Sequence, residues 1–188
     1  DQAQYPYLLF IDGDAEIVDQ SFIENYLSRL DPDTILCGGT LYDSQPPEDQ
    51  RFLLRWTFGC AREQVPAEIR QQRPWKSFST FNFVVPAKIF KQIRFNESIK
   101  SYGHEDTLFG WQLHQSGIAI LHLDNGLTHL GLEPAADFLI KVRESGNNLL
   151  RLYNLNFLPP DCVQDISLLA TWEKIKKIHL TRLVAIWF

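Results

Sequence analysis

The sequence predicts an α/β fold, with a mixed, mostly parallel sheet flanked by helices and further helices at the C-terminal end. Two observations predict it. Short continuous apolar runs of strand length alternate with longer segments in which apolar residues recur at helical spacing. No internal repeat, low-complexity tract or linker divides the 188 residues, a length that suits one domain. Within it, we expect residues 1–134 to form the sheet core and residues 135–188 to form a helical extension.

The first predicted unit is a strand, a loop and a helix. Tyr7–Ile11 is a continuous apolar run, typical of a strand that is buried on both faces, and Asp12-Gly13-Asp14 follows at its carboxyl end. A helix is expected over 22–30, where apolar residues recur at helical spacing until Asp31-Pro32-Asp33. A second short strand is expected over 34–37.

The remaining elements follow the same two patterns. Residues 44–50 contain two prolines and indicate an exposed loop, and residues 51–76, which are mixed and aromatic, receive no assignment. Further strands are expected at 81–85 and 118–123, and further helices after Pro86, over 105–116, over about 135–155 and from about 166 to the end.

The composition excludes two classes of protein. The chain has 23 acidic and 18 basic residues, a net charge of -5, so it lacks the phosphate attraction on which nucleic-acid binders rely. No apolar run approaches the roughly 18 residues that crossing a bilayer requires. The three cysteines are far apart, which indicates neither a disulfide framework nor a metal knot, and a reducing, cytoplasmic location is expected.

Three short motifs could carry chemistry. Asp12 and Asp14 lie at a predicted strand end, where α/β sheets bind ligands, and carboxylates suit Mg²⁺ or Mn²⁺. Asp-Gly is also common in surface turns. Glu105 and Asp106 open a predicted helix, where acids are favourable for electrostatic reasons alone, and His129 follows a predicted strand. Each motif taken separately has an ordinary structural explanation.

Taken together, the motifs resemble the glycosyltransferases of the GT-A fold, especially the large inverting family 2 and the related galactosyltransferase C-terminal module. The resemblance covers roughly residues 7–129 and depends on the order and spacing of four stretches, Leu8–Asp14, Phe78–Pro86, Tyr102–Phe109 and Thr128-His129. It implies a partial GT-A fold and an enzyme that moves a sugar from a nucleotide-sugar donor to a hydroxyl of a glycan or a lipid-linked acceptor.

The resemblance also implies the residues of the donor side. Asp12 would lie near the ribose of the nucleotide. Asp14 would bind the divalent cation, Mn²⁺ or Mg²⁺, that holds the diphosphate, and His129 resembles the late metal ligand of many members. Asn82 would line the sugar site.

On the acceptor side, Asp106 resembles the general base that deprotonates the acceptor hydroxyl, and Glu105 would hold the acceptor. An inverting transfer needs this separation, because the acceptor oxygen attacks the anomeric carbon opposite the leaving diphosphate. A carboxylate must therefore lie on one side and a cation on the other. Aromatic rings stack on sugar faces, and the candidates are Trp56, Trp75, Tyr102 and Trp111.

One departure from the family concerns the N-terminal side. Members carry further strand-helix units before the DxD strand, and these units form the nucleotide base pocket, whereas six residues precede Tyr7 here. We therefore expect a piece of a longer protein, without its base pocket. The DxD strand, which is interior in the family, would then become an apolar edge strand able to pair with a second copy of the chain.

Two alternatives remain open at this stage. A haloacid-dehalogenase-like phosphatase also has an apolar strand ending in DxD, but that family has Thr or Val where this chain has Glu16. A non-catalytic sugar-binding or assembly fragment would keep the fold without the reaction. The C-terminal segment predicts an amphipathic helix with an apolar side and basic residues mostly off it. The apolar side holds Leu168, Leu169, Trp172 and Ile175, and the basic residues are Lys174, Lys176, Lys177 and Arg182. This helix is expected either to pack on the domain or to make peripheral contact with an anionic membrane at its inner face.

Overall fold

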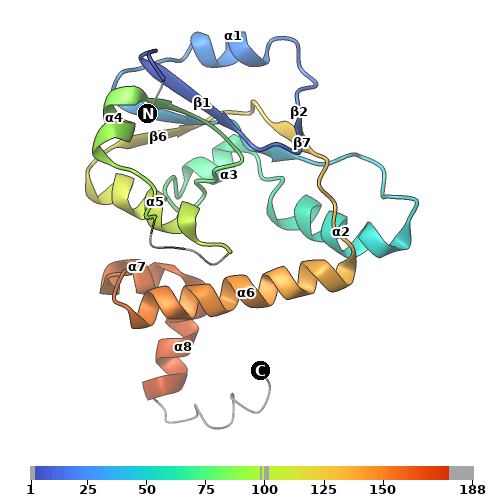
Figure 1. Cartoon of the computed structure of the whole chain (residues 1–188), viewed down its shortest axis with the longest axis vertical. Coiled ribbons are helices and arrows are strands. Elements are labelled where there is room, and N and C mark those ends of the chain that lie inside the picture. Colours follow the sequence, from blue (N-terminus) through green and yellow to red (C-terminus); the bar gives the residue numbers. More distant parts are fainter. Residues whose placement is uncertain (1–2, 98, 100–101, 178–188) are drawn as a thin grey trace.

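The computed structural model describes residues 3–97, 99 and 102–177 (Figure 1). Its strands are β1 (Tyr7–Ile11), β2 (Ala15–Glu16), β3 (Thr34–Cys37), β4 (Thr40–Leu41), β5 (Asn82–Pro86), β6 (Ala119–His122) and β7 (Leu127–His129). Its helices are α1 (Phe22–Leu27), a 3-10 turn (Gln50–Phe52), α2 (Leu53–Arg62), α3 (Ala67–Gln71), α4 (Ala87–Gln92), α5 (Glu105–Gln115), α6 (Ala135–Asn154), α7 (Pro160–Asp165) and α8 (Ser167–Lys177). The α/β class is confirmed.

The main sheet has four strands in the order β1-β5-β3-β6. It is mixed, as expected, but the prediction of a mostly parallel sheet is wrong, because β5 runs antiparallel to both of its neighbours and only β3 and β6 are parallel. The reason lies in the long connection between β3 and β5. It leaves the sheet after Cys37 and returns at Asn82, two points at the same end of the sheet, so α2 and α3 do not cross a face of it.

A smaller sheet continues from the carboxyl end of the main one. Its order is β2-β7-β4, with β2 antiparallel and β4 parallel to β7. None of these strands was expected, because segments of two or three residues are too short to show a period in the sequence. The small sheet matters because it aligns Ala15 with His129 and so brings the DxD loop to the end of β7.

Helices cover the two faces of the main sheet with different residues of the same strands. Leu36 and Val84 pack with α1, whereas Ile35 and Val85 pack in a second cluster with α5. This alternation is the period of two that strands impose. The β1 strand is less covered than the sequence predicts, and Leu9 is 39% exposed, because β1 lies at the edge of the sheet.

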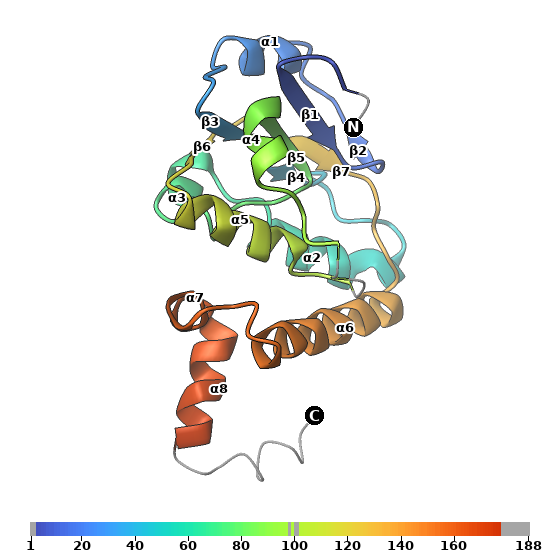
Figure 2. The same ribbon diagram turned by 60° about the vertical axis from the view of Figure 1, so that its left-hand side comes forward.

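The C-terminal helices form an outer layer below α5 (Figure 2). Leu149, Cys162 and Leu169, from α6, α7 and α8, belong to the same buried cluster as the α5 side chains. The helix α5 is buried on most sides, at residues 108–111 and at Leu113, because it lies between the sheet and this layer. Sheet and C-terminal helices therefore share one hydrophobic core.

The final helix differs in part from its prediction. Leu169 is buried, but Leu168, expected on the same side, is exposed. Arg182 and the apolar run 183–188 lie outside the described residues. Among the described residues, no helix combines the length and apolarity that crossing a membrane requires.

Candidate active site

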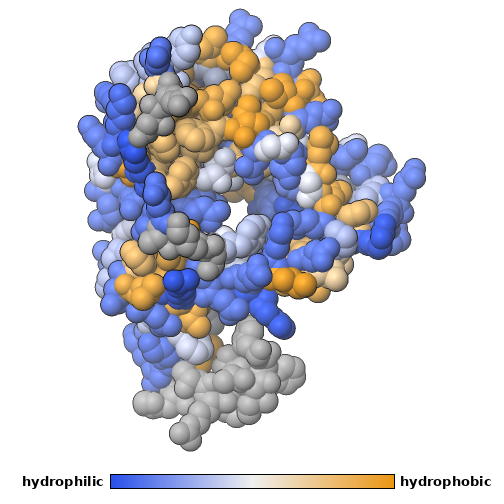
Figure 3. Space-filling model, in the orientation of Figure 1, coloured by the Kyte–Doolittle hydropathy of each residue, from blue (hydrophilic) through white to orange (hydrophobic). Residues whose placement is uncertain are grey.

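A cavity of about 600 Å³ lies at the carboxyl end of the sheet, enclosed by α2, α5 and α6. Figure 3 shows a hollow in this face, surrounded mainly by hydrophilic residues. Five of the seven predicted site residues line the cavity: Asp12, Asn82, Glu105, Asp106 and His129. Asp14 lies directly beside it through its contact with His129, and Trp111 does not line it.

Asp14 and His129 are brought together by backbone pairing. Ala15 lies opposite His129 in the small sheet, and the N–H of Leu130 donates to the carbonyl oxygen of Asp14 at 2.8 Å. The Asp14 Oδ2 atom then lies 3.5 Å from His129 Nε2. Behind the carboxylate is Gly131, where a Cβ atom would overlap Asp14 Oδ2. The position of Asp14 therefore depends on a glycine at 131.

This pair suits a hard divalent cation. Neighbouring ligands of an octahedral ion with bonds of 2.0–2.1 Å lie about 3 Å apart, close to the separation of Asp14 Oδ2 and His129 Nε2. Burial and the nearby Arg55 charge lower the pKa of His129, which favours the neutral, ligating imidazole. Within the described residues, no group of three or more acidic, His or Cys side chains is arranged to hold a metal. Two protein ligands are enough for an ion that keeps water and binds phosphate oxygens.

Asp12 occupies the first position after β1. Its backbone N–H donates to the carbonyl of Phe81 at 3.1 Å, which extends the β1–β5 pairing by one residue. Partial burial and the adjacent Asp14 carboxylate raise the pKa of Asp12. The charge of Glu105, across the cavity, acts in the same direction, so the two motifs that the sequence separates face the same space.

Asp106 and Glu105 begin α5, and an unusual backbone turn aims this helix end at the cavity. Gly103 and His104 have positive φ angles of 87° and 71°. The ring of His104 bridges Thr107 Oγ1 and Ser145 Oγ, each at 3.2 Å, and so connects α5 to α6. Burial raises the pKa of Asp106 to about 6, against the effect of the Thr107 N–H, which donates to its carboxylate at 2.7 Å.

Asn82 has a largely structural set of hydrogen bonds. Its side chain is 2% exposed, and Nδ2 donates to the carbonyls of Asn125 at 2.8 Å and Gly39 at 3.2 Å. Its Oδ1 accepts a hydrogen bond from Tyr26 Oη at 2.7 Å. Both donors of the amide are thus used to join β5 to the loops after β3 and β6. Asn82 can offer a ligand little more than the remaining acceptor capacity of Oδ1.

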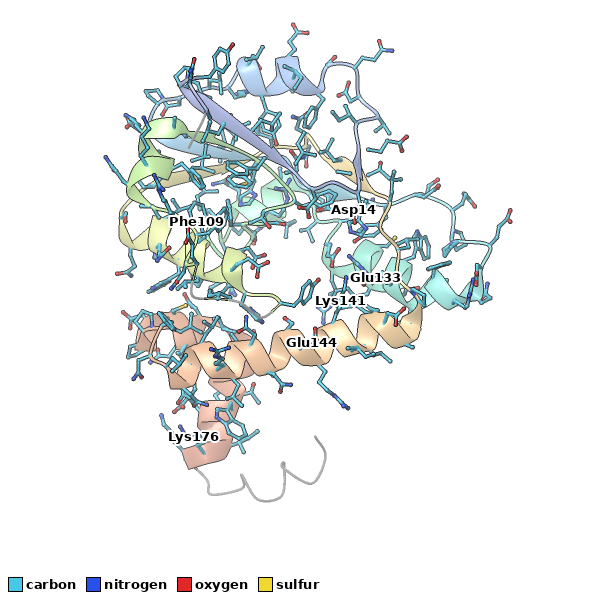
Figure 4. All side chains as sticks on the ribbon, viewed as in Figure 1. Asp14, Phe109, Glu133, Lys141, Glu144 and Lys176 are labelled. Carbon is cyan, nitrogen blue, oxygen red and sulfur yellow. The ribbon has the colours of Figure 1, made fainter. Side chains whose placement is uncertain are left out.

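The position of Trp111 does not meet the expectation that it contacts a sugar. Trp111 is 5% exposed and packs edge-on against Trp75, with ring centroids 5.0 Å apart, inside the core cluster. The reason is that α5 is buried on most sides, so its aromatic residues form core. Of the four aromatic candidates, Tyr102 lines the cavity, and Lys141 of α6 lies over its ring at 5.3 Å. Figure 4 labels Lys141 and its partner Glu133 on the α6 side and Asp14 on the sheet side.

The cavity also contains residues that the sequence reasoning missed, in the stretch that received no assignment. Arg55, Arg62 and Glu63 of the α2 region and Arg70 of α3 line it. One signal was available, because Arg55, Gly59 and Arg62 recur at the spacing of a single helix face. Without knowledge that this segment is helical, that spacing had no structural meaning.

Comparisons with known proteins give no family for the chain. No family model matches it, and no curated protein matches it.

Proposed function

We propose that the chain is the catalytic part of a metal-dependent, inverting glycosyltransferase of the GT-A type. It would transfer a sugar from a nucleotide-sugar donor to a hydroxyl of a glycan or lipid-linked acceptor. The observation that carries the proposal is the arrangement of one cavity, which has the Asp14–His129 pair at one side and Asp106, on a different element, in its wall.

The chemistry divides between these two sides. Asp106, with a pKa of about 6, is ionised at neutral pH and accepts the proton of the acceptor hydroxyl as that oxygen attacks the anomeric carbon. Glu105 holds the acceptor, and Asp12 receives the ribose. Asp14 and His129 would hold a divalent cation, and their carboxylate oxygen and neutral imidazole nitrogen are donor types that such an ion takes. When bound, the ion would supply positive charge to neutralise the leaving diphosphate.

The sheet order supports the same proposal. The resemblance implies that the DxD strand is an interior strand, with strands of preceding units on one side of it. Here β1 pairs with β5 on one side, and its other side has no strand among the described residues.

A peripheral, cytoplasmic membrane contact stays part of the proposal, since α8 carries the exposed side chains of Lys174, Lys176 and Lys177.

Asp106→Asn tests the proposal. The substitution removes the base but keeps the shape, so transfer should fall about 10²- to 10⁴-fold while donor binding changes little, because the base acts in the chemical step. The kcat/KM of the parent should also fall below pH about 6, as Asp106 takes up a proton, and the variant should lack that limb.

The matched control is Asp161→Asn, which alters an exposed acid in the first turn of α7 that does not line the cavity. Its turnover should equal that of the parent. An Asp106→Asn protein that retained most of its turnover would remove Asp106 from the reaction.

A further inference from the structure

Arg55 is held in one orientation by three neighbours. Its side chain is 9% exposed, and Nη2 donates to Glu63 Oε2 at 3.0 Å. The rings of Tyr42 and Phe138 lie 5.5 and 5.3 Å from its guanidinium carbon. Glu63 also accepts the hydroxyl of Tyr42, so both the arginine and its carboxylate partner are fixed. A side chain that normally has many rotamers is thus immobilised before any ligand arrives.

One end of this guanidinium lacks a partner. Nη1 is buried and makes no hydrogen bond with the described residues. Buried N–H groups of charged side chains are nearly always paired, since leaving one unpaired is costly. Arg55 nevertheless lies in the wall of the cavity, which is where a bound molecule could supply the missing acceptor. A bound group with an acceptor atom at this place would satisfy the unpaired nitrogen.

The location of Arg55 connects it with the Asp14–His129 pair. The ring of Tyr42 lies 5.5 Å from the Arg55 guanidinium and 5.5 Å from the His129 ring. The charge of Arg55 also contributes to the lowered pKa of His129. His129 Nδ1 is itself buried without a hydrogen-bond partner. Arg55 and His129 thus line the same cavity and share Tyr42 as a neighbour.

We propose that Arg55 is the anchor of an oxyanion subsite in this cavity, and that the group it takes is a phosphate. A planar guanidinium with one end fixed to a carboxylate presents its free end to phosphate oxygens in a set geometry. The assignment of that phosphate to the reaction rests on the proposed function, in which it belongs to the donor diphosphate or to a phosphorylated acceptor. Both sources share the same chemistry.

The first experiment measures anion binding without metal or reaction. Inorganic pyrophosphate is titrated calorimetrically into the parent chain, Arg55→Met and Arg62→Met. Arg62 is the matched control, because it comes from the same helix, lines the same cavity and carries the same charge, but its side chain is exposed. Arg55→Met should weaken binding about 10- to 100-fold, and Arg62→Met about twofold.

The second experiment separates the two sources of phosphate. Uridine diphosphate, with and without Mn²⁺, stands for the donor, and octyl phosphate stands for a lipid-linked acceptor. A loss confined to uridine diphosphate in Arg55→Met assigns the subsite to the donor, and a loss confined to octyl phosphate assigns it to the acceptor. Equal binding of all three probes by the parent and Arg55→Met, or no binding of any probe by the parent at about 10 mM, overturns the proposal.

Two further variants test whether the loss of binding results from a disturbed fold. Arg55→Lys keeps the charge, and the Arg55→Met/Glu63→Gln double variant leaves no unpaired carboxylate; both should show the loss of pyrophosphate binding, with the lysine variant less affected.

The Arg55 inference and the proposed function can be refuted independently of each other. If Arg55→Met loses pyrophosphate binding but the parent chain transfers no sugar, the subsite stands and the glycosyltransferase assignment does not. If Asp106→Asn is inactive and Arg55→Met binds normally, the reverse holds.

Discussion

Two buried arginines line the cavity, and they differ in how their N–H groups are paired. Arg70, on α3, donates to five acceptors around the carboxyl ends of β3 and β6. These are the carbonyls of Val65 (2.8 Å), Cys37 (3.3 Å), Gly38 (3.3 Å) and Leu123 (2.7 Å), and His122 Nδ1 (2.6 Å). Arg55 donates to Glu63 from one nitrogen and leaves Nη1 without a partner.

The difference teaches which buried charges support the fold and which serve a ligand. The backbone carbonyls around Arg70 lose their hydrogen bonds to water when they are buried, and the N–H groups of Arg70 replace those bonds. Arg70 therefore stabilises the loops that carry the site without taking part in it. The fold fixes the orientation of the Arg55 side chain but gives its Nη1 no hydrogen-bond acceptor among the described residues. The same residue type, in the same cavity wall, thus has a structural role in one place and a binding role in the other.

The largest expected effect tests this comparison directly. Arg70→Met should lower the free energy of unfolding by about 3 to 5 kcal/mol, because it removes a buried cation and leaves its carbonyl partners unpaired. Arg55→Met should lower it by about 1 kcal/mol, since Glu63 keeps its bond from Tyr42. Urea unfolding of both proteins measures the difference. Equal losses would mean that Arg55 is also a structural residue.

The Arg70 network should also be sensitive to pH through His122. Because Arg70 can only donate, His122 Nδ1 is the acceptor, and Nε2 donates to the carbonyl of Pro74 at 2.9 Å. Burial lowers the pKa of His122 to about 4 from 6.5. Its contribution to stability is therefore complete above pH about 6.5 and is lost as the pH falls towards 4.

Between pH 7 and 5, this contribution should decrease by about 2 kcal/mol. The measurement compares urea unfolding of the parent chain with that of His122→Gln, which has no titrating group. The variant should be less stable at pH 7, and the gap should narrow by about that amount at pH 5. A gap that did not change with pH would show that burial does not hold His122 neutral in the folded protein.

Much of the scaffold around these arginines could be predicted from the sequence. The apolar runs of β1, β3 and β6 and the helical spacing of α1 and α6 predicted those elements because burial requires these patterns. The direction of β5 could not be predicted, since an apolar run has no polarity and the connection through α2 and α3 decides it.

The site was predictable in part. Asp12, Asp14, Asp106 and His129 were chosen because of their motifs, and the structure brings all four to one region. Arg55 was missed because its importance depends on which of its nitrogens finds a partner, which no pattern of residue types records. Trp111 was misplaced because an aromatic residue on a helix buried on most sides looks the same in sequence as one on an exposed face.

Gly131, which lies against the Asp14 carboxylate, gives a prediction about the metal side of the cavity. An added Cβ would overlap Asp14 Oδ2, and since this carboxylate is the partly exposed end of a flexible side chain, it can move away. Gly131→Ala should therefore change stability by less than about 1 kcal/mol but weaken Mn²⁺ binding about tenfold, as disturbance of a ligand's support does. Calorimetric titration with Mn²⁺ measures it.

The matched control for Gly131→Ala is Gly13→Ala, inside the DxD motif itself, where an added Cβ meets nothing within 4 Å. That variant should bind Mn²⁺ like the parent. Equal weakening in both variants would mean that any change near the motif disturbs the metal, and Gly131 would have no special part in positioning Asp14.

The smallest expected effect concerns unpaired groups that are not buried. β1 is an edge strand, paired only with β5 among the described residues, so its outer backbone groups are open. Unlike Arg55 Nη1, these groups reach water, so leaving them unpaired costs little and their pairing should be weak. We expect concentration-dependent association, with the scattering mass rising towards twice that of the monomer, and Leu9→Lys should shift this rise to higher concentration, because an edge lysine opposes strand pairing. Lys88→Leu, on the exposed side of α4, is a control that leaves the strand unchanged. A parent chain that stayed monomeric at high concentration would contradict this prediction. It would show that unpaired hydrogen-bonding groups on the surface of this fold do not bind a partner and that only a buried unpaired group does.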